Sequence, residues 1–308
     1  MSIPESQLET WSNQGATVTA QNTHKSIRIA LNADTSSLKR KGFIEGRDFE
    51  IYLQGSYKNT TNIRGDSDVD VVVQLNRVFV AEISECSIAE QMLCRQMFPY
   101  SNYHWGNWRS DVLESLQAYY GWNNIDDTGN KSLKLKKGSG RLAADIVPCL
   151  QYRRYCRFRS IVDPFVEGVN FYTRRENRPV INYPKLHYEN GSVKNSVNHA
   201  NGWYKPVVRM FKNARYYLIS QGLISKDLAP SYFLECLLYN VPNDRFRASF
   251  QLSYLEVLVW LSKSLQGASS SFICQNEQMP LFGNTPEQWF IVNAQELISA
   301  LSSLWSEW

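Results

Sequence analysis

Residues 54–73 read QGSYKNTTNIRGDSDVDVVV, and this stretch decides the fold. The run EIYLQGSY lies before the polar stretch KNTTNIRGDS and the run DVDVVVQL lies after it, which predicts strand, loop, strand over residues 49–75. Side chains two residues apart in a strand lie on the same face. Asp68 and Asp70 are therefore expected to project together, with the valines beside them pointing to the other face.

Two carboxylates placed so close repel each other, and sharing a divalent cation is the usual way in which proteins relieve this repulsion. Oxygen ligands without a nearby His or Cys favour Mg²⁺ or Mn²⁺ over zinc. A two-metal site for phosphoryl transfer generally takes a third carboxylate from a neighbouring strand. Asp145 is the only acid in the small, apolar run LAADIVP. Because an unpaired Asp is costly to bury, this position favours a metal ligand over a turn or edge charge.

Gly55 and Ser56 stand at the end of the first predicted strand. A glycine there permits close approach of the backbone to a phosphate, and the hydroxyl and N–H of Ser56 are donors for phosphate oxygens. Gly-Ser alone is an ordinary turn. Its position about a dozen residues before the two acids makes it a candidate phosphate-binding element.

The sequence around this stretch mixes helix and strand patterns. A long amphipathic helix is expected over residues 16–38, because Ile27, Leu31 and Leu38 share one helical face. A second helix is expected over residues 108–120, and a hairpin with a Gly-Ser-Gly turn over residues 132–150. With at least four predicted strands and several helices, the expected fold class is α+β.

The second half of the chain reads as helical. Residues 173–201 are rich in Asn, Pro and Gly and are expected to be an ordered loop at the boundary between two lobes. The runs WYKPVVRMFKNARYYLI, PSYFLECLLYNV and LSYLEVLVWLSKSL then predict helices, the last buried nearly all round. A final helix is expected from a capping box at Thr285 and Gln288, with Pro286 at the first helical position.

Composition excludes several classes of protein. The 308 residues carry a net charge of +4, too little for a protein that neutralises a nucleic-acid backbone over many contacts, so no strong nucleic-acid binding is expected. No apolar run approaches the roughly 18 residues that span a membrane, and the start lacks the pattern of a signal peptide, so a cytoplasmic location without membrane contact is expected. The six cysteines show no zinc-ligand spacing and read mostly as small buried hydrophobes. The sequence indicates no oligomeric state.

The motifs together resemble a known family. Gly55-Ser56, then Asp68-Val69-Asp70, then the single strand residue Asp145 are similar to the polymerase-β-type nucleotidyltransferase superfamily. More narrowly, GSYKNTTNIRGDSDVDVVV resembles the bacterial cGAS-like nucleotidyltransferases (CD-NTases) of CBASS anti-phage systems. The later runs NYPKLHYENGSVKN, YKPVVRMFKNAR and PSYFLECLLYNVPN resemble branch E of that family, so that the resemblance covers residues 54–243.

The resemblance implies a polymerase-β-like core with a mixed or antiparallel sheet and a long N-terminal helix over residues 1–175. It also implies a helical lobe over residues 176–308, which completes a nucleotide cleft. Carried over by residue, Asp68 and Asp70 would hold two Mg²⁺ or Mn²⁺ ions, and Asp145 would complete the site and help to activate the attacking hydroxyl.

In the helical lobe the resemblance implies that Lys212 contacts the donor triphosphate, that Ser231 contacts phosphate and that the base stacks on Tyr232. The residues alone leave plainer alternatives. Lys212 lies on one helical face with Lys205 and Arg209, which is typical of a solvated basic surface. Ser231 follows a proline, as an N-cap would, and Tyr232 precedes Phe233, as a core residue would.

The function implied is the joining of nucleoside triphosphates, with release of pyrophosphate, into a cyclic oligonucleotide that a separate CBASS effector reads. A dinucleotide is favoured over a trinucleotide by the resemblance. The alternatives are transfer to an RNA end or a protein, and a catalytically silent nucleotide sensor, which the presence of all three acids disfavours. For base choice, the resemblance implies a side-chain amide at the base edge; Asn170 and Asn182 both lie in the matching segment, and both also suit loop residues that bond to backbone.

Overall fold

The chain divides into two compact units in the computed structural model, which describes residues 2–65, 67–267 and 271–308. The sheet unit consists of Thr17–Tyr57 and Asp66–Lys185, and the helical unit consists of Met1–Ala16, Lys58–Gly65 and Leu186–Trp308. The division expected from the sequence was a single cut at residues 175/176. The contacts instead place the main boundary at Lys185 and assign the first 16 residues and the polar loop 58–65 to the helical unit.

The described residues of the sheet unit form a seven-stranded mixed sheet, which confirms the predicted fold class. Its main path runs in the order β1-β2-β5-β4-β3, and β6 pairs with both β5 and β7. β2 and β5 are parallel, and the other pairs are antiparallel. The strands are β1 (Phe49–Leu53), β2 (Val69–Glu82), β3 (Ile125–Asp126), β4 (Leu133–Leu135), β5 (Ala144–Arg154), β6 (Val166–Tyr172) and β7 (Pro179–Asn182).

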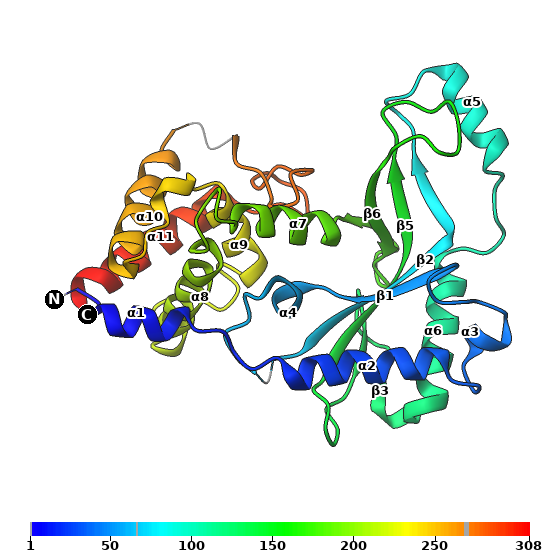
Figure 1. The fold of residues 1–308 in the computed structure, drawn as a ribbon, viewed down its shortest axis with the longest axis horizontal. Helices are drawn as coiled ribbons and strands as arrows, with labels where there is room; N and C mark the ends of the chain where they lie inside the picture. Colours follow the sequence, from blue (N-terminus) through cyan, green and yellow to red (C-terminus); the bar gives the residue numbers. More distant parts are fainter. Residues whose placement is uncertain (1, 66, 268–270) are drawn as a thin grey trace. The chain divides into compact units, whose positions relative to one another are not determined.

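The two faces of this sheet have different coverings. Val71 and Val73 of β2 pack in the same apolar cluster as residues of α2 (Val18–Asn32) and α6 (Trp105–Tyr120), the two long helices of the unit (Figure 1). Val72, which points to the opposite face, packs instead with residues of β5, β6 and β7. Because side chains alternate along a strand, Asp70 lies on the same face as Val72, away from α2 and α6.

The long helix expected over residues 16–38 is interrupted. α2 ends at Asn32, and a short helix α3 (Ser37–Arg40) follows. Ser36 separates them, since its hydroxyl donates to the carbonyl of Leu31 at 2.7 Å and accepts the N–H of Leu38 at 3.2 Å. The apolar face was nevertheless read correctly, because Ile27, Leu31 and Leu38 are all buried.

Among the elements of the sheet unit that were not expected, β6 and α4 have an identifiable local feature. β6 contains Gly168, a residue that usually weakens a strand. Here a Cβ on Gly168 would lie 2.9 Å from the carbonyl oxygen of Asn182, so that the glycine allows β7 to approach closely. The loop after β1 also begins with a single helical segment, α4 (Gly55–Asn59).

The far ends of β2 and β5 carry α5 (Ile88–Met97) and a small apolar cluster of their own. Tyr155 and Phe158, from the arginine-rich run YRRYCRFRS, pack there with Cys86 and Cys94. Five of the six cysteines are buried, as expected, and Cys156 is exposed.

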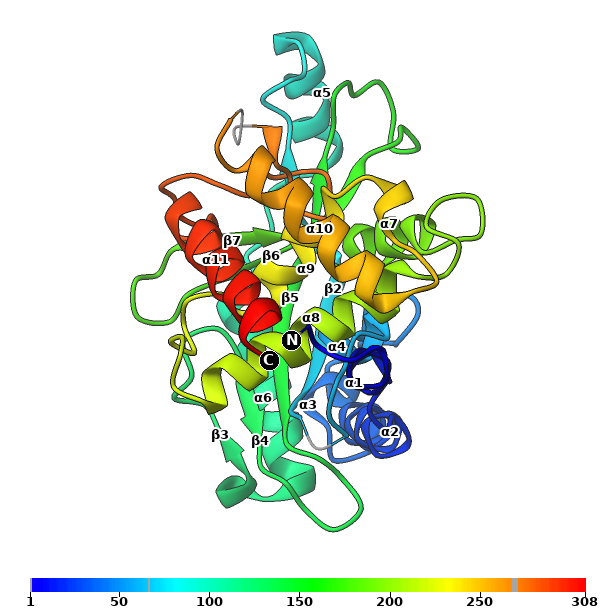
Figure 2. The ribbon, with the colours of Figure 1, turned by 90° about the vertical axis from the view of Figure 1, so that its left-hand side faces the viewer.

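The helical unit is built around one apolar core. Phe211 stacks on Tyr254 with 4.8 Å between ring centroids, and Tyr254 stacks in turn on Trp305. In Figures 1 and 2 α11 runs alongside α10, and both contribute to this core. Among the described residues no helix is long and apolar enough to span a bilayer. The helices are α1 (Glu5–Ser12), α7 (Pro184–Lys194), α8 (Tyr204–Ser220), α9 (Ser231–Tyr239), α10 (Phe250–Ser264) and α11 (Ile291–Glu307).

The segment expected to be an irregular loop, residues 173–201, contains β7 and α7. Its Asn and Gly residues serve a tertiary contact within the helical unit. The Asn190 amide donates to the carbonyl of Gln275 at 2.9 Å, and a Cβ on Gly191 would lie 2.3 Å from Nε2 of Gln275. Packing against residue 275 therefore overrides the low helix propensity of this stretch.

Two further helix predictions need correction. The last helix begins at Ile291, although the Thr285 hydroxyl does donate to Gln288 at 3.0 Å. The Gln288 amide donates onward to the carbonyl of Phe282, which holds these residues in a turn. α10 is not buried all round, because Leu252 and Val259 are exposed.

Glu5 ties the first helix to the start of α10. Its carboxylate accepts the N–H groups of Phe250 at 2.6 Å and Gln251 at 2.8 Å, two donors that α10 itself leaves unpaired. We expect Glu5→Ala to lower the free energy of unfolding by about 1–3 kcal/mol, the range for hydrogen bonds to a charged group. Chemical denaturation will measure it. Glu9→Ala, at an exposed position of the same helix, should change stability little; equal losses would contradict the capping role.

Candidate active site

The three acids predicted from the sequence lie at one end of the parallel pair β2 and β5. Asp70 is the second residue of β2, and its Cα pairs with that of Asp145 on β5. Asp68 precedes β2 by one residue. The structure thus brings Asp70 and Asp145 side by side on the sheet face that α2 and α6 leave uncovered.

Two side chains that the sequence reasoning missed contact these acids. Nζ of Lys134 lies 2.8 Å from Oδ2 of Asp68, a contact that raises the pKa of Lys134. The Ser132 hydroxyl donates to Oδ1 of Asp145 at 3.1 Å. Lys134 is the exposed residue between buried leucines in β4, so the alternation of that strand was the available signal.

The donor chemistry of the three acids fits a hard divalent cation, since all three supply carboxylate oxygens. As they stand, however, no three or more His, Cys, Asp and Glu side chains within the described ranges are gathered closely enough to hold an ion. Asp68 is paired with the ammonium of Lys134 instead. A cation bound by all three would replace Lys134 on Asp68.

Gly55 lies against this group of acids. Its φ is +64°, and a Cβ at this position would lie 2.2 Å from Oδ2 of Asp70. Any other residue would therefore be strained and would collide with the carboxylate. The glycine is required for the chain to pass Asp70, and Ser56 follows it as a half-buried residue of α4.

In the helical unit Lys212 is not part of a solvated basic face. Its side chain is only 3% exposed and forms an ion pair with Glu235. Its neighbours on α8 are also engaged, since Arg209 donates to the carbonyl of Thr60 at 2.7 Å. Lys205 donates to the Ser192 hydroxyl at 3.3 Å. The alternative of an exposed, diffuse cationic surface is therefore wrong.

Ser231 and Tyr232 open α9 of the same unit. The N-cap of this helix is Pro230, which offers no side-chain cap, and the exposed Ser231 is the first helical residue. Tyr232 is 36% exposed, unlike the fully buried Phe233, so it is not a core residue. One side of its ring stacks on His187, with 5.2 Å between centroids and an interplanar angle of 24°.

The two candidate asparagines differ in what their side chains do. Oδ1 of Asn182 accepts the N–H of Tyr183 at 2.8 Å, as expected of a residue that bonds to local backbone. Asn170 lies in the middle of β6 and is 3% exposed, and its Oδ1 has no hydrogen-bond partner among the described residues. Strand alternation places Asn170 on the sheet face of Leu150, its partner on β5, and places Asn182 with Val169 on the opposite face, which carries Asp70 and Asp145.

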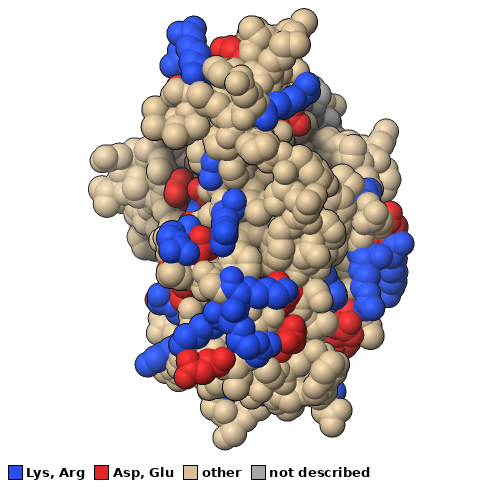
Figure 3. Space-filling view, turned by 90° about the vertical axis from the view of Figure 1, so that its right-hand side faces the viewer, with Lys and Arg blue, Asp and Glu red and all other residues tan. Residues whose placement is uncertain are grey.

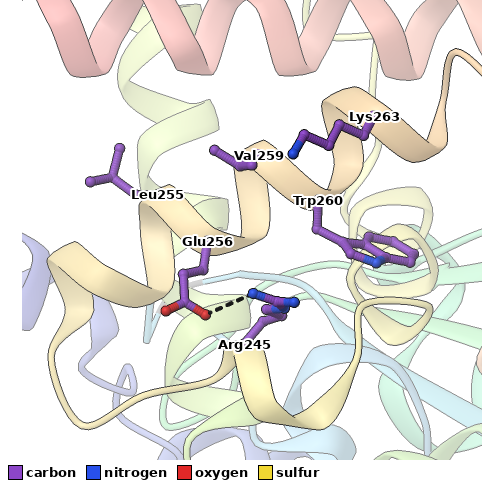
Figure 4. Close-up of a pocket in the computed structure, with 6 residues that line it drawn as sticks. All are labelled: Arg245, Leu255, Glu256, Val259, Trp260 and Lys263. Carbon is purple, nitrogen blue, oxygen red and sulfur yellow. Dashed lines mark hydrogen bonds and ion pairs between the residues drawn. The ribbon is translucent and has the colours of Figure 1, made fainter.

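Other surface features lie outside these groups of residues. A pocket on α10 is lined by residues that include Trp260 and the ion pair of Arg245 with Glu256 (Figure 4). None of the predicted site residues lines it. On the face shown in Figure 3 cationic and anionic side chains lie beside each other. Exposed ion pairs of the sheet unit include Lys39–Asp34 and Arg40–Glu114.

Comparison with known proteins gives a consistent picture. The model of the cGAS/DncV-like nucleotidyltransferase C-terminal helical domain matches residues 189–306. The chain is 50% identical over 308 residues to the cyclic UMP-AMP synthase of Rhodothermus marinus, covering 100% of this chain and 99% of the relative. It is 41% identical over 313 residues to the cyclic nucleotide synthase CdnE01 of Staphylococcus haemolyticus, covering 100% of both.

Solved structures resemble the chain along its whole length. The structure of the Rhodothermus marinus CdnE c-UMP-AMP synthase with Apcpp and Upnpp has a TM-score of 0.87 at 49% identity, covering 99% of this chain and 97% of that one. The Elizabethkingia meningoseptica CdnE cyclic dinucleotide synthase with GTP and Apcpp has a TM-score of 0.75 at 28% identity, covering 99% and 98%.

The contact between Lys134 and Asp68 predicts a competition with metal. We expect Lys134→Met to tighten Mn²⁺ binding in the absence of nucleotide by about three- to tenfold, since an adjacent positive charge is removed. Paramagnetic relaxation of water protons will measure the affinity. Lys136→Met removes a charge two residues away without breaking the contact, and an equal gain in that variant would argue against direct competition.

Proposed function

Because the chain belongs to the cGAS/DncV-like nucleotidyltransferases, we propose that it joins two nucleoside triphosphates into a cyclic dinucleotide. The observation that carries this is the full-length identity of 50% to a cyclic UMP-AMP synthase. The three acids expected of such an enzyme are all present, at Asp68, Asp70 and Asp145. Transfer to an RNA end or a protein, and a silent sensor, are not favoured by any of the relatives described above.

The reaction consists of two successive phosphoryl transfers. A ribose hydroxyl of one nucleotide attacks the α-phosphorus of the other, the bond to the β-phosphate breaks and pyrophosphate leaves with the electron pair. A second transfer in the opposite sense closes the ring and releases a second pyrophosphate. The protein supplies position and charge rather than covalent chemistry.

Asp68, Asp70 and Asp145 would hold the divalent ions, for which we propose two Mg²⁺ or Mn²⁺ per site. When bound, these ions neutralise phosphate charge and make the attacking hydroxyl more acidic. Asp145 lies next to Asp70 across the β2–β5 ladder and would help to take up the proton of that hydroxyl. The N–H and hydroxyl of Ser56 would donate to phosphate oxygens.

The helical unit would bind the rest of the nucleotide. Ser231 and Lys212 would contact the donor triphosphate, and Tyr232, which is 36% exposed, would stack on its base. Uracil presents both an acceptor and an N–H donor at its edge, and one carboxamide matches both. Asn182 is the side chain we propose for this contact, because it lies on the sheet face that carries Asp70 and Asp145, whereas Asn170 lies on the face of Leu150.

The name of the 50% identical relative then suggests the product. We propose that at least one pyrimidine nucleotide enters it, with cyclic UMP-AMP as the leading candidate. The product would act as a second messenger in the cytoplasm, read by a separate CBASS effector in defence against phage. The small net charge supports a protein that binds nucleotides locally without strong nucleic-acid binding.

The metal assignment predicts that Asp68→Asn with Asp70→Asn abolishes product formation from labelled NTPs and leaves the protein folded. The neutral amides remove mutual repulsion and cannot replace carboxylates as ligands of a divalent ion. Thin-layer chromatography will follow the product, and thermal melting will follow the fold. Asp126→Asn, on the nearby edge strand β3, is the matched control. A retained rate, or a large loss of stability, would exclude the catalytic assignment.

Base choice is tested by Asn182→Ser and by Asn170→Ser as its control. Supplying the four NTPs singly and in pairs, we expect Asn182→Ser to shift incorporation from pyrimidine toward purine nucleotides, because the amide that matches uracil is lost. The control should keep the pattern of the wild type. Abundant wild-type product from ATP and GTP alone, with UTP and CTP neither incorporated nor competing, would disprove the proposal.

A further inference from the structure

A buried carboxylate connects the residues proposed to bind nucleotide in the helical unit. Glu235 lies in α9 and is 4% exposed, in a run that is otherwise apolar or aromatic. Side chains from other segments of the same unit converge on it. They are Lys212 of α8, His187 of α7 through Nε2 at 3.3 Å, and Thr61 and Asn59 of the polar loop at 2.7 and 3.4 Å.

This carboxylate is charged. Burial alone raises the pKa of Glu235, but the Lys212 ammonium and the His187 ring outweigh that effect and hold the pKa far below its usual range. A buried charge of this kind persists only where partners satisfy it. The cluster is therefore fixed by its central acid, and removing the charge releases each partner.

Lys212 is held on one side by this acid. Its ammonium has three protons, which reach Glu235, the Thr61 hydroxyl at 3.1 Å and the Thr61 carbonyl at 3.2 Å. The ion pair with Glu235 is the closest of the three contacts. A triphosphate oxygen that approaches Lys212 would replace the longer contacts with Thr61, while the carboxylate continues to fix the position of the ammonium.

His187 extends the cluster to the base-stacking residue. Its Nε2 contacts Glu235, its backbone carbonyl accepts from the Gln275 amide at 2.7 Å, and its ring stacks on Tyr232. The imidazole is thus held at its edge by the acid and presents its face to Tyr232. The tyrosine ring is held by this stacking together with the Asn276 amide, which donates to its hydroxyl at 3.4 Å.

We propose that Glu235 is a positioning residue of the nucleotide site, which sets Lys212 for the triphosphate and, through His187, sets Tyr232 for the base. The inference rests on the proposed function for the roles of Lys212 and Tyr232. It adds that the phosphate contact and the base contact share one support, so that removing the charge of Glu235 weakens both.

The test uses Glu235→Gln, which keeps the shape of the side chain and removes its charge. Affinities for tripolyphosphate and for the α,β-methylene analogue of ATP are measured by calorimetry, so that binding is read without turnover. We expect both to weaken by about tenfold, with KM raised similarly and kcat changed by less than about threefold. His187→Gln should weaken the ATP analogue but leave tripolyphosphate binding unchanged, because only the base platform loses its support.

A double-mutant cycle separates positioning from general damage to the fold. If Glu235 acts through Lys212, the double variant Glu235→Gln with Lys212→Met binds tripolyphosphate no more weakly than Lys212→Met alone. Glu235→Asp, which retains the charge, should recover part of the affinity. Glu189→Gln, at an exposed position of α7, is the matched control and should have no effect.

The outcomes are distinct. Unchanged tripolyphosphate binding in Glu235→Gln, or effects of Glu235→Gln and Lys212→Met that multiply as independent losses, would overturn the inference. If Glu235→Gln does not fold, equal effects of His187→Gln on both ligands would overturn it in the same way. A wild-type protein that binds both ligands yet forms no cyclic product would refute the proposed function and leave the role of Glu235 in binding standing.

Discussion

The parallel pairing of β2 with β5 is the constraint on which the candidate catalytic residues depend. Its register places Asp70 opposite Asp145, on the face that α2 and α6 do not cover. A slip of one residue would turn one of these acids to the opposite face. Parallel strands require a long crossover, and residues 83–143, which include α6, supply it. Trp108 of α6 is fully buried and donates to the carbonyl of Val73 at 3.0 Å. The helix that covers one face of the sheet thus also fixes the strand that carries the acids on the other.

A structural feature could be predicted from the sequence where the interactions that produce it join residues close together in the chain. The alternation in DVDVVVQL is local, and it identified β2 correctly, with Asp70 inside the strand and Asp68 just before it. Ser36 and Gly168 act through a hydrogen bond and a close backbone approach that no periodicity reveals, so the break after α2 and the strand β6 were missed. Asn190 lies in a helix because Gln275, 85 residues later, accepts its amide.

The case of Glu235 is different, because a local signal was present. The sequence singled out Asp145 as the only acid in an apolar run, and the run SYFLECLLY has the same property. The physical argument is identical in both, since an acid in such a run must find a partner. Applied to α9, it would have predicted a buried cation, and the lysine that it would have found is Lys212. The basic residues of α8 instead predicted a solvated face for Lys212, and the burial of its side chain contradicts that prediction.

In each unit a lysine side chain forms an ion pair with one of the acids discussed above. Lys134 neutralises Asp68 at the edge of the sheet, and Lys212 neutralises Glu235 in the helical core. The first pair is exposed on both sides, so solvent screens it and it adds little to stability. The second is buried and cannot be broken without leaving a charge uncompensated. A metal can therefore replace Lys134 at small cost, whereas a phosphate that uses Lys212 must bind beside Glu235 rather than displace it.

The two asparagines show how strand alternation separates candidates that the sequence left equal. Asn170 pairs with Leu150 and lies on the sheet face that α2 and α6 cover, where its buried Oδ1 has no hydrogen-bond partner among the described residues. Asn182 pairs with Val169 and lies on the opposite face, which carries Asp70 and Asp145. A buried carbonyl oxygen without a partner costs about 1–3 kcal/mol, but that cost does not by itself indicate a ligand. Because only a side chain on the face of the acids can contact a nucleotide held beside them, the position of Asn182 outweighs the unpaired oxygen of Asn170.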